Sequence, residues 1–394
     1  MSSTAVILSA ARTPIGAFQG ALSSLSAPAL GVVAAKAALA RAGISGADID
    51  EVYAGMVLPA GVGQAPARQI ALGAGIPNTV PATTVNKVCG SSLKAVMLAA
   101  QAIRAGDANV VLAGGAESMS NVPYYLGGAR GGLKMGDQRL VDGMIKDGLW
   151  DVYNDYHMGN AAELCARECD VTREAQDEFA KESYRRALAA QERGWFKDEI
   201  VSVELPQKKG PALVVSEDEE PKRGQLDKFG ALKPAFVKDG TVTAANASSI
   251  DDGAAMVVVA SKDWADAQGL QPLAIIEGYG SAAQAPEWFT TAPTKAIEAT
   301  TKRLGVALSE IDLFEINEAF AVVSIANERK LGLDRSKVNV HGGAVALGHP
   351  IGASGARILT TLLYAMSRYD KRRGLASLCI GGGEAVALVV RRGS

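Results

Sequence analysis

The chain has 394 residues, 48% of them hydrophobic and 21% charged, and its 40 basic and 42 acidic residues leave a formal net charge of −2. This length accommodates two or three domains, and the near-neutral charge excludes a general attraction to nucleic acid or to an anionic membrane. Because there is no apolar run of about 20 residues, no basic-apolar leader pattern and no CxxC pair, we expect a cytoplasmic protein without membrane spans or a disulfide framework.

Strand-like and helix-like segments alternate from the start of the chain. Residues 5–10 (AVILSA) form an apolar strand pattern, and residues 27–43 form an alanine-rich helix pattern that closes with a glycine. A second helix pattern with a glycine stop spans 91–106, and a strand pattern spans 108–119. This alternation predicts an α/β protein with a mainly parallel sheet covered by helices on both faces.

The same order of segments occurs twice. ADIDEVYAGMV at 47–57 resembles SEIDLFEINEAFA at 309–321, so that Asp50 aligns with Asp312 at an offset of 262 residues. At this offset Cys89 aligns two residues beyond His349. Two related halves that face each other would bring these two helix starts to a shared centre. We therefore predict a first half over 1–120, completed by about 247–270, and a second half over 271–394.

The segment between the halves has a different composition. Residues 121–246 contain glycine-rich loops and a charged amphipathic helix pattern at 172–194, and they do not repeat elsewhere. This span is too structured for a linker. We interpret it as an inserted loop domain that covers a ligand.

Four short blocks contain candidate reactive groups: VNKVCGSSLKA with Cys89, EINEAFA with Asn317, GGAVALGHPIGASGAR with His349 and LCIGGGEAVAL with Cys379. A thiol at the start of a helix lies where the helix dipole favours the thiolate. A glycine turn after a strand, such as the one around Gly381, is a common way to build an oxyanion site. Taken alone, Cys89 and Cys379 are better explained as packed cysteines and His349 as a capping or core histidine.

Taken together and in order, these blocks resemble the signature loops of the thiolase family. Further matching blocks are AARTPIGAFQG, AGGAESMSNVPY, DVYNDYHMG and DGTVTAANASSIDDGAA. The resemblance implies a thiolase fold, in which two similar βαβαβαββ halves form a five-layered α-β-α-β-α core with an inserted loop domain. It also implies an acyltransferase that performs a reversible Claisen condensation, turning two acetyl-CoA into acetoacetyl-CoA plus CoA through an acetyl-cysteine intermediate.

The resemblance assigns a role to each of the reactive groups. Cys89 becomes acetylated after His349 takes its proton, and Cys379 then removes a proton from the second acetyl-CoA. One oxyanion site consists of His349 and a water held by Asn317, and a second consists of the backbone N–H groups of Cys89 and Gly381.

The resemblance further implies that the inserted domain binds CoA and that the protein is a homotetramer, with 124–136 as a candidate assembly loop. Acetyl-CoA, acetoacetyl-CoA and CoA are the expected partners, and no metal or redox cofactor is required. Pro221 stands where the potassium-activated members have a tyrosine, which makes a potassium site doubtful. The implied substrate-binding residues are His157, Ser248, Arg223, Leu149, Phe236, Ala244, Phe289, Ala319 and Phe320.

Three other interpretations remain open at this point. A degradative 3-ketoacyl-CoA thiolase would use the same four reactive residues on longer chains. A condensing enzyme of the ketoacyl-synthase type would share the cysteine nucleophile without needing Cys379. An inactive relative would bind CoA or a lipid without transferring an acyl group.

Overall fold

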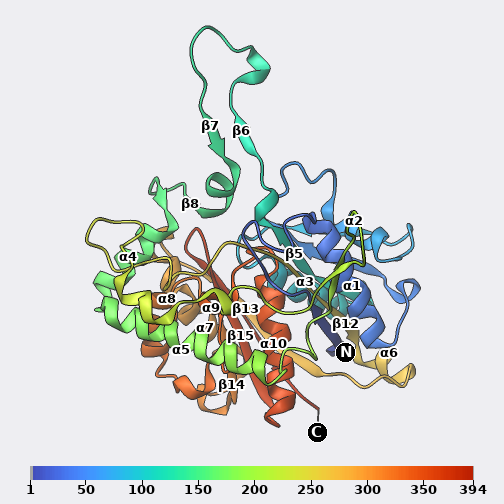
Figure 1. Ribbon diagram of the computed structural model, residues 1–394. Coiled ribbons are helices and arrows are strands. Elements are labelled where there is room, and N and C mark those ends of the chain that lie inside the picture. The colour runs from blue at the N-terminus through green and yellow to red at the C-terminus, as the bar shows by residue number, and fades with distance from the viewer. Residues whose placement is uncertain (1–2, 394) are drawn as a thin grey trace.

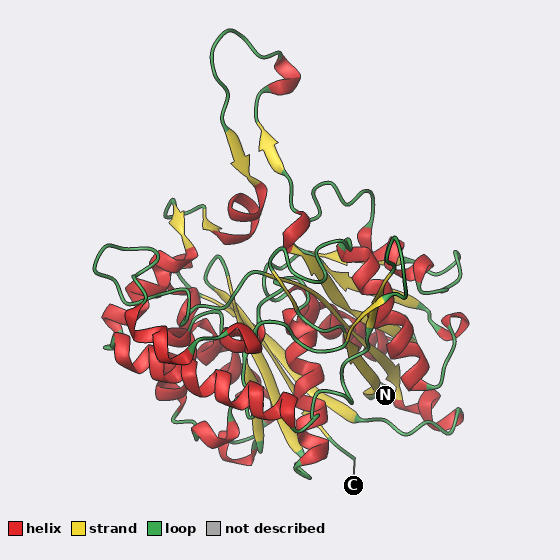
Figure 2. Cartoon of the chain, viewed as in Figure 1, coloured by secondary structure: helices red, strands yellow, loops and turns green. Residues whose placement is uncertain are grey.

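Ten strands form one large sheet in the computed structural model, which describes residues 3–393 (Figures 1 and 2). The first half contributes β1 (Ala5–Arg12), α1 (Ala27–Ala42), β3 (Glu51–Gly55), α2 (Pro66–Gly73), β4 (Ala82–Val85), α3 (Ser91–Ala105), β5 (Val110–Ser118) and β12 (Asp251–Ser261), with the short β2 (Gly16–Ala17) beside β12 and α6 (Lys262–Ala267) after it. The second half contributes β13 (Ala274–Ala283), α7 (Ala292–Leu304), β14 (Leu313–Ile316), α8 (Ala321–Leu331), α9 (Ala344–Leu347), α10 (Ser354–Arg368), β15 (Arg373–Ile380) and β16 (Glu384–Arg391).

The order of strands repeats between the halves. The sheet runs β14-β15-β16-β13-β1-β12-β5-β3-β4, so β3-β5-β12-β1 in the first half corresponds to β14-β15-β16-β13 in the second. The counterpart of β4 is reduced to a single parallel bridge between Phe314 and Val338. The duplication inferred from residues 47–57 and 309–321 is therefore also present in the strand order.

The expectation of a mainly parallel sheet is wrong at the level of strand pairs. β3 pairs in parallel with β4 and β5, and β14 with β15, but β12 pairs antiparallel with both β5 and β1. In the same way β16 pairs antiparallel with β15 and β13. The connections differ accordingly, because helices lie between the parallel strands, whereas β16 follows β15 after the short turn 381–383 and β12 follows β5 after the inserted segment. Each of these last strands lies between two others.

The helices form three layers around the two halves of the sheet. α1 and α2 pack on the outer face of the first half, and α7 packs on the outer face of the second. α3 and α10 lie side by side between the halves and share one buried core with strands of both. As expected from their sequences, α1 and α3 end at glycines in the left-handed region, Gly43 (φ 70°) and Gly106 (φ 86°).

Part of the inserted segment, residues 121–246, packs beside the carboxyl end of β15, where Gly381 lies next to Met158. The hairpin of β6 (Tyr124–Leu126) and β7 (Leu140–Asp142) projects from the body as a long arm (Figure 1). Closer to the core lie β8 (Trp150–Asp151), β9 (Tyr156–His157), α4 (Met158–Glu168) and α5 (Arg173–Glu192), followed by the hairpin of β10 (Val203–Leu205) and β11 (Leu213–Val215).

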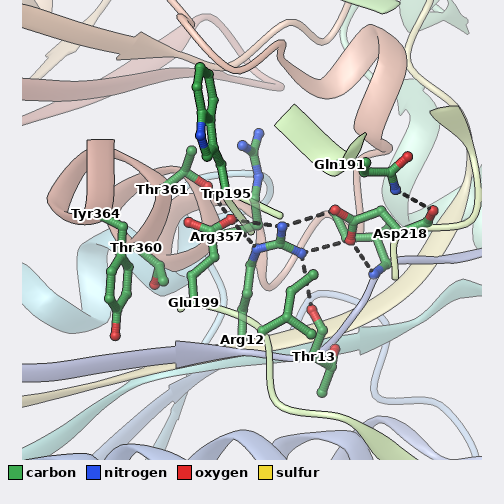
Figure 3. A network of polar contacts seen from close by, with 12 residues as sticks. Arg12, Thr13, Gln191, Trp195, Glu199, Asp218, Arg357, Thr360, Thr361 and Tyr364 are labelled. Atoms are coloured by element: carbon green, nitrogen blue, oxygen red, sulfur yellow. Dashed lines mark hydrogen bonds and ion pairs between the residues drawn. The ribbon is translucent and has the colours of Figure 1, made fainter. Parts of the chain in front are cut away.

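A buried ionic network fastens this segment to β1 (Figure 3). The Arg12 guanidinium donates to Glu199 at 2.7 Å and to both carboxylate oxygens of Asp218 at 2.7 and 2.9 Å. All three side chains are essentially inaccessible to solvent. Removing one partner would leave a charge buried and unpaired, so the network fixes where the inserted segment meets the core. Among the described helices, none is long and apolar enough to cross a membrane.

Candidate active site

One cavity of about 260 Å³ lies where the two halves and the inserted segment meet. Cys89 and His349 both line it, and so does Gly381, as the duplication predicted for the first two. The other lining residues are Val88, Met119, Gly148, Leu149, His157, Met158, Phe236, Ala247, Ser248, Ser249, Ile250, Phe289, Ala319, Phe320 and Ile351. Most of this wall is apolar, which suits a site that excludes water from a reacting carbonyl.

The loop before α3 presents Cys89 on a strained turn. Val88 has φ 45°, a left-handed conformation that is costly for a β-branched residue. The Ser91 hydroxyl supports the turn, because it donates to the carbonyl of Val88 at 2.6 Å and accepts from the N–H of Lys87 at 2.9 Å. The thiol consequently lies at the amino end of α3, partly exposed to the cavity.

The first turns of α3 and α10 meet at very close range. A methyl group added to Gly355 would lie 2.5 Å from the backbone nitrogen of Leu93, a distance that real Cβ atoms do not show. Glycine at 355 is therefore required for the approach of the two helices. This contact is what brings the loops of Cys89 and His349 to one cavity.

Three neighbours hold the His349 loop and its imidazole. The backbone N–H of His349 donates to Asp251, which is fully buried, at 2.8 Å. The amide nitrogen of Asn317 lies 3.5 Å from each ring nitrogen, and Nδ1 lies 2.6 Å from the Ser354 hydroxyl. That hydroxyl has one proton and donates it to the Pro350 carbonyl at 2.9 Å. It therefore accepts from Nδ1–H, an assignment that leaves Nε2 as the proton acceptor.

Burial sets the protonation states of the reactive groups. It raises the pKa of Cys89 to about 11, although hydrogen bonds from the backbone N–H groups of Gly381 and of Cys89 itself act in the opposite direction. It lowers the pKa of His349 to about 3, with a smaller contribution from the charge of Arg357. The expectation that the helix start favours the thiolate is thus outweighed by desolvation. At neutral pH the pair is a thiol and a neutral imidazole.

Cys379 and Asn317 lie behind the cavity wall. Cys379 is 1% exposed at the end of β15 and packs in a cluster with the lining residues Met158, Phe289 and Phe320. Burial and then the charge of Cys89 raise its pKa well above the usual value, which places the two sulfurs in one electrostatic environment. Asn317 is 1% exposed, and its Oδ1 has no hydrogen-bond partner among the described residues.

Seven of the nine expected substrate-binding residues line the cavity. His157 caps α4 by accepting from the N–H of Gly159 at 3.1 Å, and its ring stacks on Phe236 with centroids 4.8 Å apart. Ser248 donates to the carbonyl of Ala319 at 2.9 Å. Leu149, Phe289 and Phe320 complete the set.

The remaining two do not line it. Arg223 is half exposed and lies 3.6 Å from Glu220 and 3.8 Å from Glu219, and Ala244 is exposed. Sequence reasoning missed several lining residues, of which Met119, Met158 and Ile351 each lie within a matched block. Within residues 3–393, no group of three or more His, Cys, Asp or Glu side chains has the arrangement of a metal site.

The chain is similar to known proteins over nearly its whole length. The family model described as "Thiolase, N-terminal domain" matches residues 5–263, and "Thiolase, C-terminal domain" matches 270–392. An acetyl-CoA acetyltransferase of Cupriavidus necator is 56% identical over 388 residues, which cover 98% of this chain and 99% of that protein.

Two solved structures are similar along their full length. The acetyl-CoA acetyltransferase of Bacillus anthracis has a TM-score of 0.97 at 41% identity and covers 99% of both chains. The Acat5 thiolase from Ascaris suum in complex with coenzyme A has a TM-score of 0.94 at 45% identity and covers 99% of this chain and 100% of that one. These matches confirm the predicted fold.

Proposed function

The chain belongs to the thiolase family, and on that premise we propose the chemistry of its site. The protein is an acyltransferase that condenses two acetyl-CoA into acetoacetyl-CoA and CoA, reversibly. The observation that carries the proposal is the convergence of Cys89, His349 and the Gly381 backbone on one largely apolar cavity.

In the first half-reaction, Nε2 of His349 takes the thiol proton as the Cys89 sulfur attacks the thioester carbonyl. The backbone N–H groups of Cys89 and Gly381, which already point at the Cys89 sulfur, receive the developing oxyanion. Collapse of the tetrahedral intermediate breaks the C–S bond to CoA, which leaves as a thiol with the proton of Cys379. His349 keeps the proton of Cys89, and Cys379 becomes a thiolate.

In the second half-reaction, the Cys379 thiolate removes a proton from the methyl carbon of another acetyl-CoA. Its buried surroundings make this sulfur a strong base, since a charged form that is poorly solvated gains most from taking a proton. His349, held by Asn317, stabilises the enolate oxygen, and the free Oδ1 of Asn317 is suited to hold a water there. The enolate carbon then attacks acetyl-Cys89, whose sulfur leaves and recovers its proton from His349.

CoA is proposed to lie over the cavity mouth formed by the inserted segment, with Ser248 beside its pantetheine arm and His157 against the acyl end. The Ascaris suum structure, which contains coenzyme A, supports this class of ligand. Contact of Arg223 with the nucleotide phosphates stays a prediction, because that side chain is outside the cavity.

We propose further that thiol, imidazole and amide groups carry the reaction without a resident metal or redox cofactor. Pro221 lies buried in a short 3-10 helix, Pro221–Arg223, and its ring offers no oxygen from the side chain to potassium. Potassium activation therefore stays doubtful, and assays with and without the ion test it. A cytoplasmic location also stays a prediction, to be tested by fractionation of the source cells.

A homotetramer is the proposed assembly. The β6–β7 arm supports it, because this long projection has large apolar side chains in contact with solvent, among them Tyr124, Leu133, Met135 and Leu140. Exposed apolar surface of this kind marks an interaction site.

The decisive experiment is mass spectrometry after exposure to acetyl-CoA. One acetyl group should be added to the peptide that contains Cys89, and the Cys89→Ser variant should acquire none there. Absence of acetylation in the wild-type protein would favour the inactive, ligand-binding interpretation. A substrate panel separates the degradative alternative, because a preference for 3-ketooctanoyl-CoA over acetoacetyl-CoA would contradict the short-chain assignment.

A further inference from the structure

Glu117, at the end of β5, is a fully buried carboxylate that receives three backbone hydrogen bonds. Its Oε2 accepts from the N–H groups of Val57 at 2.9 Å and Gly352 at 3.0 Å, and its Oε1 accepts from that of Leu58 at 3.2 Å. Among the described residues, no cationic side chain pairs with it. Burying a carboxylate without a cation lowers the stability of the fold, so a role for Glu117 must be sought elsewhere than in stability.

The three donors belong to two loops from opposite halves of the molecule. Val57 and Leu58 follow β3 in the first half, whereas Gly352 lies between Ile351 and Ser354 in the loop of His349. Val57, Leu58 and Ile351 share one apolar cluster, against which Cys89 packs. The carboxylate therefore joins the two loops directly behind the cavity wall at the nucleophile.

The contact between Gly352 and Glu117 is so close that only glycine fits at position 352. A methyl group added to Gly352 would lie 2.6 Å from Oε2 of Glu117 and 3.0 Å from the Cα of Met56. The amino ends of α3 and α10, whose dipoles are positive at that end, meet in the same region. A negative charge on Glu117 is therefore stabilised both by the three backbone N–H donors and by the positive ends of these two helices.

We propose that Glu117 is a positioning residue: its carboxylate locks the loop after β3 to the His349 loop, and its charge lies behind the apolar cluster against which Cys89 packs. The proposal rests on the proposed function for its catalytic meaning. Its geometric part, the locking of the two loops, is independent of any substrate.

The pKa of Glu117 decides when this charge is present, and the carboxyl is ionised at the pH 9 of the test below. Burial raises the pKa of Glu117 to about 7, the three backbone N–H groups oppose the shift, and the neighbouring carboxylate of Asp252 adds to it. Burial is the main cause that raises the pKa of Cys89, and the charge of Glu117 adds a smaller contribution in the same direction. The other titratable groups around Cys89 are His349 and His157, which line the same cavity, and Cys379 behind its wall.

Two variants of Glu117 separate the effect of its charge from the effect of its reach to both loops. Glu117→Gln keeps the shape but removes the charge and turns an amide N–H₂ towards one of the backbone donors. Glu117→Asp keeps the charge but is one methylene too short to reach both loops. Glu163→Gln is the matched control, because Glu163 is also buried and accepts from the backbone N–H groups of Thr241 and Val242, at 2.8 Å each, away from Cys89.

We expect kcat to fall about ten-fold or more in both Glu117 variants, with little change in KM, because the loops and not the CoA contacts are displaced. Alkylation of Cys89 by iodoacetamide at pH 9, without any acyl-CoA, should be about three-fold or more faster in Glu117→Gln and not in Glu117→Asp, since only the former loses the like charge. Glu163→Gln should match wild type in both assays.

Equal alkylation rates in Glu117→Gln and wild type, or an equal loss of kcat in Glu163→Gln, would overturn the proposal. If Glu117→Gln does not fold, hydrogen exchange in the wild-type protein decides: the amides of Val57, Leu58 and Gly352 should be protected although they lie in loops, and rapid exchange would contradict the junction. Because alkylation and exchange need no substrate, their failure is distinct from a failure of acetyl transfer.

Discussion

The backbone N–H of Ala356, in the first turn of α10, donates to the hydroxyl of Ser92, in the first turn of α3, at 2.9 Å. Both residues are fully buried, and they come from opposite halves of the chain. The bond joins two helix starts that each leave backbone donors unpaired, so that one half satisfies a donor of the other. It also fixes the separation between the loops that carry Cys89 and His349.

Ser92→Ala should therefore lower stability. The N–H of Ala356 would lose its partner while remaining buried, at a cost of about 1–3 kcal/mol. Calorimetry should show a Tm a few degrees lower. Ser324→Ala is the matched control, because the buried hydroxyl of Ser324 has no hydrogen-bond partner in the described part of the chain, and its loss should leave Tm unchanged or raise it. Equal effects of the two substitutions would contradict this account.

Cys379→Ala should separate the two half-reactions. Cys89 should still become acetylated, although more slowly, because His349 still takes its proton while CoA must leave without the proton of Cys379. Condensation should fall by about 10²–10⁴-fold with the loss of the base. Mass spectrometry of the Cys89 peptide and a coupled assay for acetoacetyl-CoA measure the two quantities. A variant that condenses at the wild-type rate would support a mechanism of the ketoacyl-synthase type instead.

The reactivity of Cys89 should rise with pH across the neutral range. With the pKa of Cys89 raised to about 11, the thiolate fraction grows with pH up to that value. With the pKa of His349 lowered to about 3, the imidazole stays neutral and unable to stabilise a thiolate by charge. The logarithm of the iodoacetamide alkylation rate should climb about one unit per pH unit between pH 6 and 10. A plateau between pH 6 and 8 would reveal a preformed thiolate–imidazolium pair.

Phe289 should limit the size of the acyl group. It is 2% exposed, lines the cavity and packs edge-on against Phe320 with ring centroids 6.5 Å apart. Phe289→Leu frees volume at that wall, so the rate on 2-methylacetoacetyl-CoA relative to acetoacetyl-CoA should increase. Parallel thiolysis assays on both substrates measure the ratio, and Phe179→Leu, which alters a buried ring outside the cavity, serves as the comparison. An unchanged ratio would exclude Phe289 from the acyl wall.

Shortening the β6–β7 arm should change the assembly and not the chemistry. Replacing residues 127–139 by a short turn removes the exposed side chains of Leu133 and Met135, while the strands that lead to the body remain. Light scattering should then report a smaller species than the tetramer proposed for the wild-type protein, with Cys89 still acetylated by acetyl-CoA. A wild-type monomer would contradict the proposed assembly at the outset.

Several features could be predicted from local sequence because local forces decide them. Gly43 and Gly106 end their helices since the left-handed conformation there costs glycine little. The internal repeat placed Cys89 and His349 at equivalent helix starts. The family resemblance proposed nine substrate-binding residues, of which seven line the cavity. The sequence did not show that Ala244 and Arg223 lie outside the cavity, because the residues that line a cavity come from several distant segments.

The amino-acid order thus determined the repeat, the helix limits and the identity of the reactive groups, which depend on residues near one another in the chain. Only the tertiary structure decided that β12 runs antiparallel to β5 and β1, that Glu117 joins loops from both halves, and that burial raises the pKa of Cys89. The physical reason is the same in each case. The direction of β12, the hydrogen bonds of Glu117 and the desolvation of Cys89 are set by segments far apart in the chain, and no local pattern records what will surround a side chain once those segments have packed.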